Sequence, residues 1–153
     1  LLLLLVANGS PVLARLLFGR RLNAALDGGL RFMYGRPLLR PNKSWRGLIA
    51  AVLASSFVAV LLGHTWCLGA LLGLLAMVGD SLASFIKRRL AIPPQGRAVG
   101  LDQLPESLLP LGVLHQVLGL DIVQILLVAT LFMLLEMALS PLLYRLHIRL
   151  RPY

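Results

Sequence analysis

The chain has 153 residues, of which 58% are hydrophobic and 14% are charged, and its mean hydropathy is +0.84. A soluble domain of this size cannot bury so much apolar surface, so the composition excludes a soluble globular protein and indicates an integral membrane protein. The formal net charge of +9 comes from fifteen Lys and Arg against six Asp and Glu. In a chain this apolar, an excess of cations is typical of cytoplasmic loops in a membrane protein rather than of nucleic-acid binding.

The N-terminal part begins with the apolar run Leu1–Ala7. This run is too short to span a bilayer and no Met precedes it, so we expect it to be the end of a first transmembrane helix that starts upstream. Residues 8–46 are polar, basic and interrupted by Gly and Pro, and we expect a loop there. Asn8 and Ser10, followed by Pro11, predict a turn or helix cap directly after the first helix.

The middle of the chain contains two further apolar segments. Leu48–Leu62 is predicted to be a short span, and the tight turn Gly63–Thr65 separates it from the next one. Trp66–Ile86 is predicted to cross the membrane and carries Asp80 near its far end. Residues 87–105 are basic and contain Pro93-Pro94, so they are predicted to form a loop.

The C-terminal part is predicted to contain a short helix, Leu108–Leu118, and a full-length span, Ile122–Leu143. The predicted fold is therefore an all-α integral membrane domain of about five transmembrane helices, with residues 1–153 forming one domain. The two short helices, this one and Leu48–Leu62, either pack against a second copy in a homodimer or lie tilted and buried within one chain.

The cations are distributed on one side of this arrangement. All fifteen Lys and Arg fall in residues 8–46, in residues 87–105 and in the tail after residue 143, and the two intervening turns have none. Because successive spans alternate across the membrane, every cation lies on the same side. The positive-inside rule makes that side cytoplasmic, so we expect a multi-pass protein of the cell membrane with its polar site facing the cytoplasm.

Asp80 lies near the end of an apolar segment, where a carboxylate is costly unless it has a partner or a ligand. At about 100° per residue, Asp80, Ser84 and Lys87 fall within about 60° of one another on a helix, with Arg88 beside them. One helical face would therefore offer a carboxylate, a hydroxyl and two cations, the groups that hold a metal-bound polyphosphate. The alternative is a transmembrane helix ending in a basic stop-transfer cluster, with Asp80 paired to an arginine.

A second acidic position, Asp102, lies about twenty residues after Asp80 in the predicted loop. Two such carboxylates suit metal-assisted phosphoryl transfer, because Mg²⁺ is usually held by one or two carboxylates plus substrate phosphates. Pro105 and Glu106 indicate a helix start, with proline near the first position and an acid in the first turn. Glu106 is therefore either a third metal ligand or a helix-start residue.

The segment 41–47 leads into the second apolar span and combines a lysine, a hydroxyl and an arginine, at Lys43, Ser44 and Arg46. A loop of this kind favours phosphate binding, because the N–H groups at a helix N-terminus attract anions. Juxtamembrane cations beside a tryptophan are also common without any ligand. From these residues alone, both interpretations stay open.

Together, these motifs resemble those of the CTP-transferring lipid cytidylyltransferases. They cover roughly residues 41–107 and comprise Gly79-Asp80, Ser84, Lys87-Arg88, Leu101-Asp102-Gln103 and the Pro-x-Lys-Ser-Trp-x-Gly loop. The branch that they resemble is the CDP-archaeol synthase family, which is related to the phosphatidate cytidylyltransferases. The resemblance implies a reaction in which a lipid phosphate displaces pyrophosphate from CTP, with Mg²⁺ required.

The resemblance also implies a role for each matching residue. The catalytic residues would be Asp80, Asp102, Lys87 and Arg88. The residues that bind substrate would be Lys43, Ser44, Arg46, Ser84 and Gln103. Mg²⁺ would be held by Asp80, Asp102 and Glu106. The partners would be CTP and a lipid phosphate from the bilayer, either an isoprenoid ether or a diacyl ester, with no nucleic acid involved.

The chain departs from the family pattern after Asp102. Gln103 replaces the arginine of the phosphatidate enzymes, and Pro105 followed by Glu106 stands where the archaeal-type motif usually has an acid. The alternative function is therefore a non-catalytic or divergent membrane protein that binds anionic lipid headgroups through its basic loops. A small transporter is a third hypothesis, but it would need a polar pathway through the membrane midplane, and most of the acids lie towards one face.

Overall fold

A computed structural model gives the structure of the chain and describes residues 1–19, 24–26, 28, 31–32, 36–37, 43–92 and 100–145. The described residues form five helices, in the order α1 (Leu2–Phe18), α2 (Trp45–Leu61), α3 (Trp66–Arg89), α4 (Leu104–Leu118) and α5 (Ile122–Arg145). The predicted helical architecture is confirmed. A small antiparallel pair of strands, β1 (Arg31–Phe32) and β2 (Arg36–Pro37), lies in the segment that was expected to be a loop.

Two of the helices are long and apolar enough to cross a membrane. Both α3 and α5 have 24 residues, and their most apolar windows have mean hydropathies of 1.8 and 2.4. At 1.5 Å per residue such a helix is about 36 Å long, which exceeds the roughly 30 Å hydrocarbon core of a bilayer. The helices α1 and α2 are also apolar but have 17 residues each.

The first helix differs from the prediction, because it continues past the expected turn to Phe18. Pro11 lies inside α1 and has no N–H group to donate to the carbonyl of Ala7. The hydroxyl of Ser10 lies 3.4 Å from that carbonyl oxygen and donates to it instead. Side chains that satisfy a freed carbonyl in this way allow proline within membrane helices. The turn predicted at Asn8, Ser10 and Pro11 is therefore wrong.

The helices α2 and α3 form a tightly packed hairpin joined by the turn at Gly63. Small residues make the close approach possible: a Cβ atom on Gly69 would lie 2.6 Å from the Cβ of Ala59. A Cβ atom on Gly73 would lie 2.8 Å from both the Ser55 hydroxyl oxygen and a backbone carbonyl oxygen of α2. Glycines four residues apart facing small residues are typical of helix pairs in membranes, where backbones approach closely.

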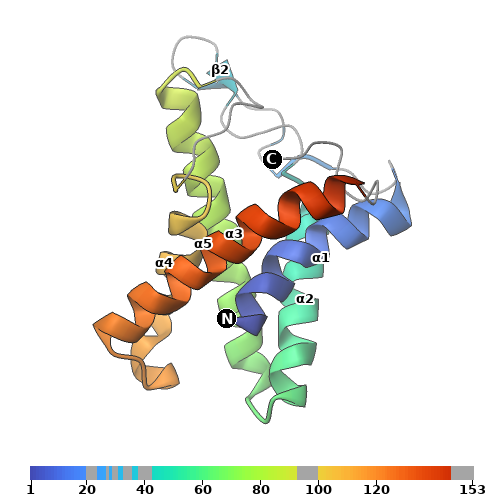
Figure 1. Cartoon of the computed structure of the whole chain (residues 1–153). Helices are drawn as coiled ribbons and strands as arrows, with labels where there is room; N and C mark the ends of the chain where they lie inside the picture. Colours follow the sequence, from blue (N-terminus) through green and yellow to red (C-terminus); the bar gives the residue numbers. More distant parts are fainter. Residues whose placement is uncertain are drawn as a thin grey trace.

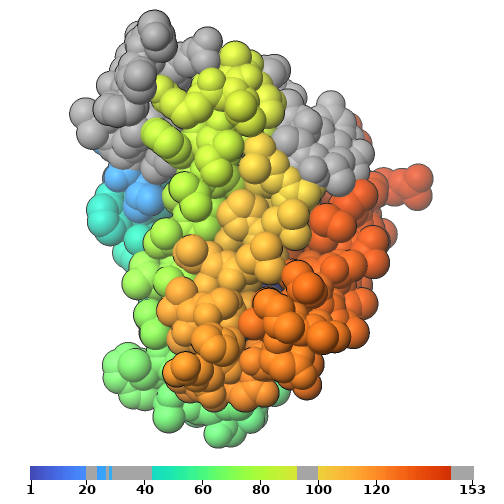
Figure 2. All heavy atoms as spheres, turned by 90° about the vertical axis from the view of Figure 1, so that its left-hand side faces the viewer, coloured from blue at the N-terminus to red at the C-terminus, as the bar shows by residue number. Residues whose placement is uncertain are grey.

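The short helix α4 packs between α3 and α5, as Figure 2 shows on one face of the molecule. Its N-terminal turn touches α3 at Gly79, where a Cβ atom would meet the Pro105 carbonyl oxygen and the backbone of Glu106. Pro105 lies at the start of α4, as predicted, and Gly119 ends the helix with φ of +64°. The left-handed conformation at this end favours glycine.

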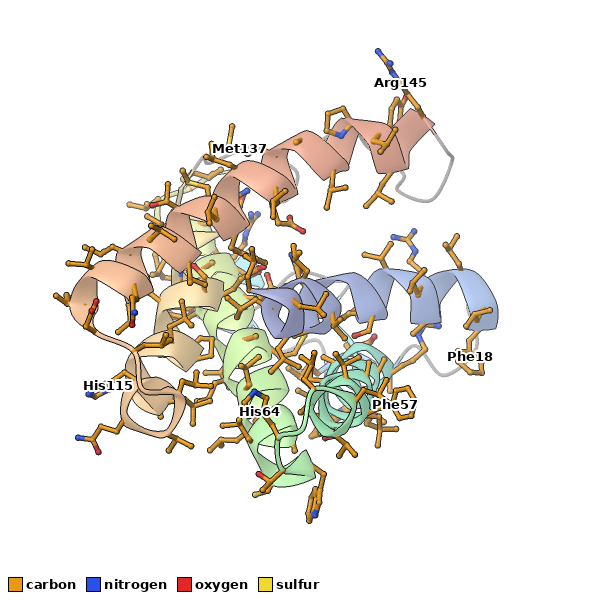
Figure 3. All side chains as sticks on the ribbon, turned by 60° about the horizontal axis from the view of Figure 1, so that its bottom comes forward. Phe18, Phe57, His64, His115, Met137 and Arg145 are labelled. Atoms are coloured by element: carbon orange, nitrogen blue, oxygen red, sulfur yellow. The ribbon has the colours of Figure 1, made fainter. Side chains whose placement is uncertain are left out.

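One core joins all five helices, formed by buried apolar side chains such as Leu4, Ala76, Leu111 and Phe132. Many large apolar side chains lie instead on the outside, and Figure 3 shows Phe18 and Phe57 projecting away from the bundle. Figure 1 places the α2–α3 and α4–α5 turns towards one end of the molecule. The C-terminal end of α3 and strand β2 lie towards the opposite end, where the candidate site is found.

Candidate functional site

The polar end of α3 is turned into the protein rather than towards solvent. The helix continues through Arg89, one turn beyond its predicted end at Ile86. Ser84 and Arg88 are buried, and the Lys87 side chain has an exposed fraction of 0%. A stop-transfer cluster would place its cations in water or among headgroups, so this burial favours the interpretation of the face as a built site.

Lys87 forms an ion pair with Asp102. Its Nζ donates to the two carboxylate oxygens of Asp102 at 2.8 and 2.9 Å. Asp102 lies in the turn just before α4 and is 31% exposed. Because a fully buried ammonium is costly without a partner, this contact ties the turn before α4 to α3. Two predicted parts of the site, fifteen residues apart in the chain, therefore meet.

Asp80 also forms an ion pair with a lysine. Lys43 Nζ donates to Asp80 Oδ2, so the segment before α2 contacts the middle of the site. The backbone of Lys43 is held in place, because the Leu26 N–H donates to the Lys43 carbonyl at 2.9 Å and Ala25 pairs with Ser44 as an isolated β-bridge. The alternative prediction, in which Asp80 pairs with an arginine, is therefore wrong: the partner of Asp80 is a lysine.

Three of the predicted substrate-binding residues make contacts within the protein. The Ser44 hydroxyl accepts from the Gly47 N–H at 3.3 Å and caps the start of α2. Arg46 donates from Nη1 to the Gly19 carbonyl at 2.9 Å, which joins the ends of α1 and α2. The Gln103 side-chain oxygen accepts from a backbone N–H of the preceding turn at 3.1 Å. These contacts position the loops, and the substrate roles of the three residues stay predictions.

Glu106 lies in the first turn of α4 and is buried. Its backbone packs against Gly79, the residue before Asp80. Gly79 belongs to the Gly79-Asp80 motif, but its role in this contact was not predicted from the sequence. A glycine next to a carboxylate inside an apolar helix is the signal that would have indicated a close backbone approach at this point.

The carboxylates offer a limited set of metal ligands. Within residues 43–92, 100–145 and the other described parts, no three His, Cys, Asp or Glu side chains gather closely enough to hold a metal ion. Asp80 and Asp102 are 24% and 31% exposed, so each carboxylate is accessible to a ligand. Mg²⁺ is usually bound through one or two carboxylates plus substrate phosphates and waters. The donor set fits that mode and does not form a cage made of protein ligands alone.

Asp80 and Lys87 lie on the same face of α3, about 10 Å apart along its axis. Side chains on a helix lean towards its N-terminus, so the Lys87 stem leans in the direction of Asp80. The arrangement brings two carboxylates and two lysines to one end of the helix bundle. It can bind a polyphosphate with a divalent cation and neutralise charge that develops on phosphate oxygens.

Comparisons with known proteins agree with this chemistry. Residues 62–153 match the family model described as "CarS-like: CDP-archaeol synthase". CDP-archaeol synthases of Hyperthermus butylicus and Saccharolobus solfataricus are both 41% identical to this chain, over 106 and 105 residues. Each match covers 65% of this chain, and the chain spans 60% and 59% of the length of those two relatives.

The similarity extends beyond that segment in another relative and in a solved structure. The CDP-archaeol synthase of Sulfurisphaera tokodaii is 33% identical over 155 residues, which cover 97% of this chain and 90% of the relative. A structure reported as "Structural insight into an intramembrane enzyme for archaeal membrane lipids biosynthesis" superposes with a TM-score of 0.69. It is 29% identical, and 90% of each chain is covered.

Proposed function

We propose that this chain, which belongs to the CDP-archaeol synthase family, transfers a cytidylyl group from CTP to a lipid phosphate in the membrane. The products are a CDP-activated lipid and pyrophosphate. The observation that carries the proposal is the pairing of Lys43 with Asp80 and of Lys87 with Asp102 at the polar end of α3. It supplies carboxylates for a metal and cations for phosphates in one place.

The reaction is a displacement at phosphorus. An oxygen of the lipid phosphate attacks the α-phosphorus of CTP, the bond from that phosphorus to the bridging oxygen of the β-phosphate breaks, and pyrophosphate leaves. A phosphate monoester is already ionised at neutral pH, so little general-base help is needed. Lys43, Lys87 and Arg88 would orient the phosphates and neutralise their charge, which supplies most of the rate acceleration.

Asp80 and Asp102 would hold Mg²⁺ between themselves and the phosphates of CTP. When bound, the ion would neutralise charge on the transferring and leaving phosphates. Glu106 is a candidate for a third ligand, supported by its packing beside Gly79 next to Asp80. Its place in the first turn of α4 is equally that of a helix-start residue.

For the membrane arrangement, we propose about five transmembrane helices with the site facing the cytoplasm. The lengths of α3 and α5 support two full spans, and the neighbouring solved structure is described as an intramembrane enzyme. The cytoplasmic orientation is supported by the absence of Lys and Arg from residues 47–86 and 98–144. CTP would then reach the site from the cytoplasm and the lipid from the inner leaflet.

The lipid that we propose is an isoprenoid ether phosphate, because the relatives are named for archaeol and the solved structure for archaeal membrane lipids. The short helices would either pack against a second copy in a homodimer or lie tilted within one chain. Within one chain, α2 already packs its small residues, including Ala51 and Ala59, against α3. Crosslinking of the protein in nanodiscs would distinguish a dimer from a tilted helix within a monomer.

The test is pyrophosphate release by the protein in detergent, with CTP, Mg²⁺ and either phosphatidic acid or a geranylgeranyl ether phosphate. We expect release with the ether lipid, and loss of release in Asp80→Asn and Asp102→Asn. Asp121→Asn is the matched control, because Asp121 caps the start of α5 by accepting from the Gln124 N–H at 2.8 Å, at the other end of the bundle.

Full activity in both site variants would overturn the proposal. Stoichiometric binding of anionic lipid without any release of pyrophosphate would instead support the alternative function, a headgroup-binding membrane protein.

A further inference from the structure

The two lysines of the candidate site differ in how firmly they are held. The Lys87 side chain is 0% exposed and contacts both oxygens of Asp102. The Lys43 side chain is 15% exposed, and its ammonium contacts Asp80 Oδ2. A buried ion pair is costly to open, whereas a partly exposed ion pair exchanges partners at lower cost, because water can reach the separated charges.

Lys87 is therefore suited to stay in place when ligands bind. Moving its ammonium away from Asp102 would break an ion pair with both carboxylate oxygens in a buried environment, which is costly. Its helix is also fixed at this point, because the Ile92 N–H donates to the Lys87 carbonyl at 3.0 Å. Lys87 therefore keeps the turn that carries Asp102 in place, and it stays a fixed cation for the phosphates of the proposed reaction.

Lys43 is suited to change partners. Its backbone is anchored to residues 24–26, so the change requires only a rotation of the side chain. Its ammonium lies against Asp80, the carboxylate that a divalent cation needs in the proposed reaction. An ammonium and a divalent cation compete for the same carboxylate, and a nucleotide phosphate offers the lysine an alternative partner.

We propose that Lys43 is a placeholder: it occupies Asp80 in the ligand-free protein, and it moves to a phosphate when the nucleotide binds. Metal binding at Asp80 is then weak without nucleotide and strong with it. The inference rests on the proposed function, because it takes Asp80 as a metal ligand and a nucleotide phosphate as the second partner of Lys43. It adds an order of binding that neither the ion pair nor the family alone specifies.

The test is Mn²⁺ binding to the nucleotide-free protein, measured by electron paramagnetic resonance of free Mn²⁺. We expect Lys43→Met to bind Mn²⁺ about fivefold more tightly than the unmodified protein, because a competing, partly exposed ion pair has been removed. Lys43→Gln should behave similarly and serves as a second variant if Lys43→Met does not fold. Lys43→Arg keeps the cation and should bind Mn²⁺ as the unmodified protein does.

A matched control separates local competition from overall charge. Arg15→Gln removes one exposed cation from the last turn of α1, outside the two ion pairs. Its affinity for Mn²⁺ should change by less than twofold, because exposed charges are screened over distances beyond about 8 Å in physiological salt. Unchanged or weaker Mn²⁺ binding in folded Lys43→Met and Lys43→Gln would overturn the inference.

The outcome is independent of the activity test. If Lys43→Met binds Mn²⁺ more tightly but the unmodified protein releases no pyrophosphate, Lys43 competes with the metal for Asp80 and the proposed reaction is rejected. If the unmodified protein releases pyrophosphate but the Lys43 variants bind Mn²⁺ as it does, the proposed reaction stands and the competition of Lys43 with the metal is rejected.

Discussion

Gly79 of α3 lies directly against the backbone of Glu106 in α4: a Cβ atom on Gly79 would stand 2.6 Å from the Glu106 Cα atom. A Cβ atom does not approach a backbone atom this closely, so α4 would have to move if residue 79 had a side chain. Asp80 follows Gly79 directly, and Asp102 lies just before α4. The relative position of the two carboxylates therefore depends on a glycine.

We expect Gly79→Ala to lower kcat for pyrophosphate release by about 10-fold to 100-fold, because a shift of about 1 Å misplaces groups that must align in the transition state. Overpacking should also lower the free energy of unfolding by about 1–3 kcal/mol. Both are measured in the same detergent preparation. Gly112→Ala in α4 is the control, since nothing lies within 4 Å of its added Cβ atom, and it should keep full activity.

Removing Asp102 from the Lys87–Asp102 ion pair is expected to lower the free energy of unfolding more than removing Lys87. Asp102→Asn leaves a lysine with 0% exposure facing a neutral group, and we expect it to lower the free energy of unfolding by about 3 kcal/mol. Lys87→Met fills the same volume with an apolar side chain and leaves a carboxylate that water can reach. It should therefore lower the free energy of unfolding by less than Asp102→Asn does. Thermal unfolding in detergent measures the stability of both variants. A larger loss of stability in Lys87→Met than in Asp102→Asn would contradict the prediction.

The close contact between α2 and α3 predicts that Gly69→Ala destabilises the protein. The added Cβ atom would meet the Ser55 carbonyl and lie 2.6 Å from the Ala59 Cβ atom, so the two helices must separate. We expect a loss of about 1–3 kcal/mol in the free energy of unfolding. Gly9→Ala in α1 has nothing within 4 Å of its added Cβ atom and should be neutral or stabilising. Equal unfolding temperatures for the two variants would contradict the prediction.

Divalent cations are expected to be required for activity. Treatment with EDTA should abolish pyrophosphate release, and added Mg²⁺ should restore it, because Asp80 and Asp102 supply the oxygen ligands that this ion takes. Ca²⁺ should restore little, since it prefers about six to eight ligands at longer distances. Release that continues at full rate in EDTA would argue against a metal in the reaction.

Much of the fold could be predicted from the sequence, because long apolar segments identify membrane helices directly. The predicted segments correspond to α2, α3, α4 and α5 with small differences at their ends. The predicted end of α3 at Ile86 is too early, because clustered cations usually mark a loop, whereas Lys87 and Arg88 are helical and buried.

The course of α1 could not be predicted by the same rule. Gly, Pro and Asn mark turns in soluble proteins, but the hydroxyl of Ser10 contacts the Ala7 carbonyl that Pro11 leaves free. In the site, helical periodicity placed Asp80, Ser84 and Lys87 on one face. The pairing of Lys43 with Asp80 spans 37 residues, and no local pattern specifies such a contact.

The glycine contact between α2 and α3 bears on the order in which the site forms as the protein assembles. These two helices are adjacent in the chain and joined by a short turn, so they can close into a hairpin before α4 and α5 are in place. Lys43 and Asp80 both belong to this hairpin and its entry segment, whereas Asp102 reaches Lys87 only when α4 docks. The Lys43–Asp80 pair can therefore form with the hairpin, and docking of α4 then adds the Lys87–Asp102 pair and completes the site.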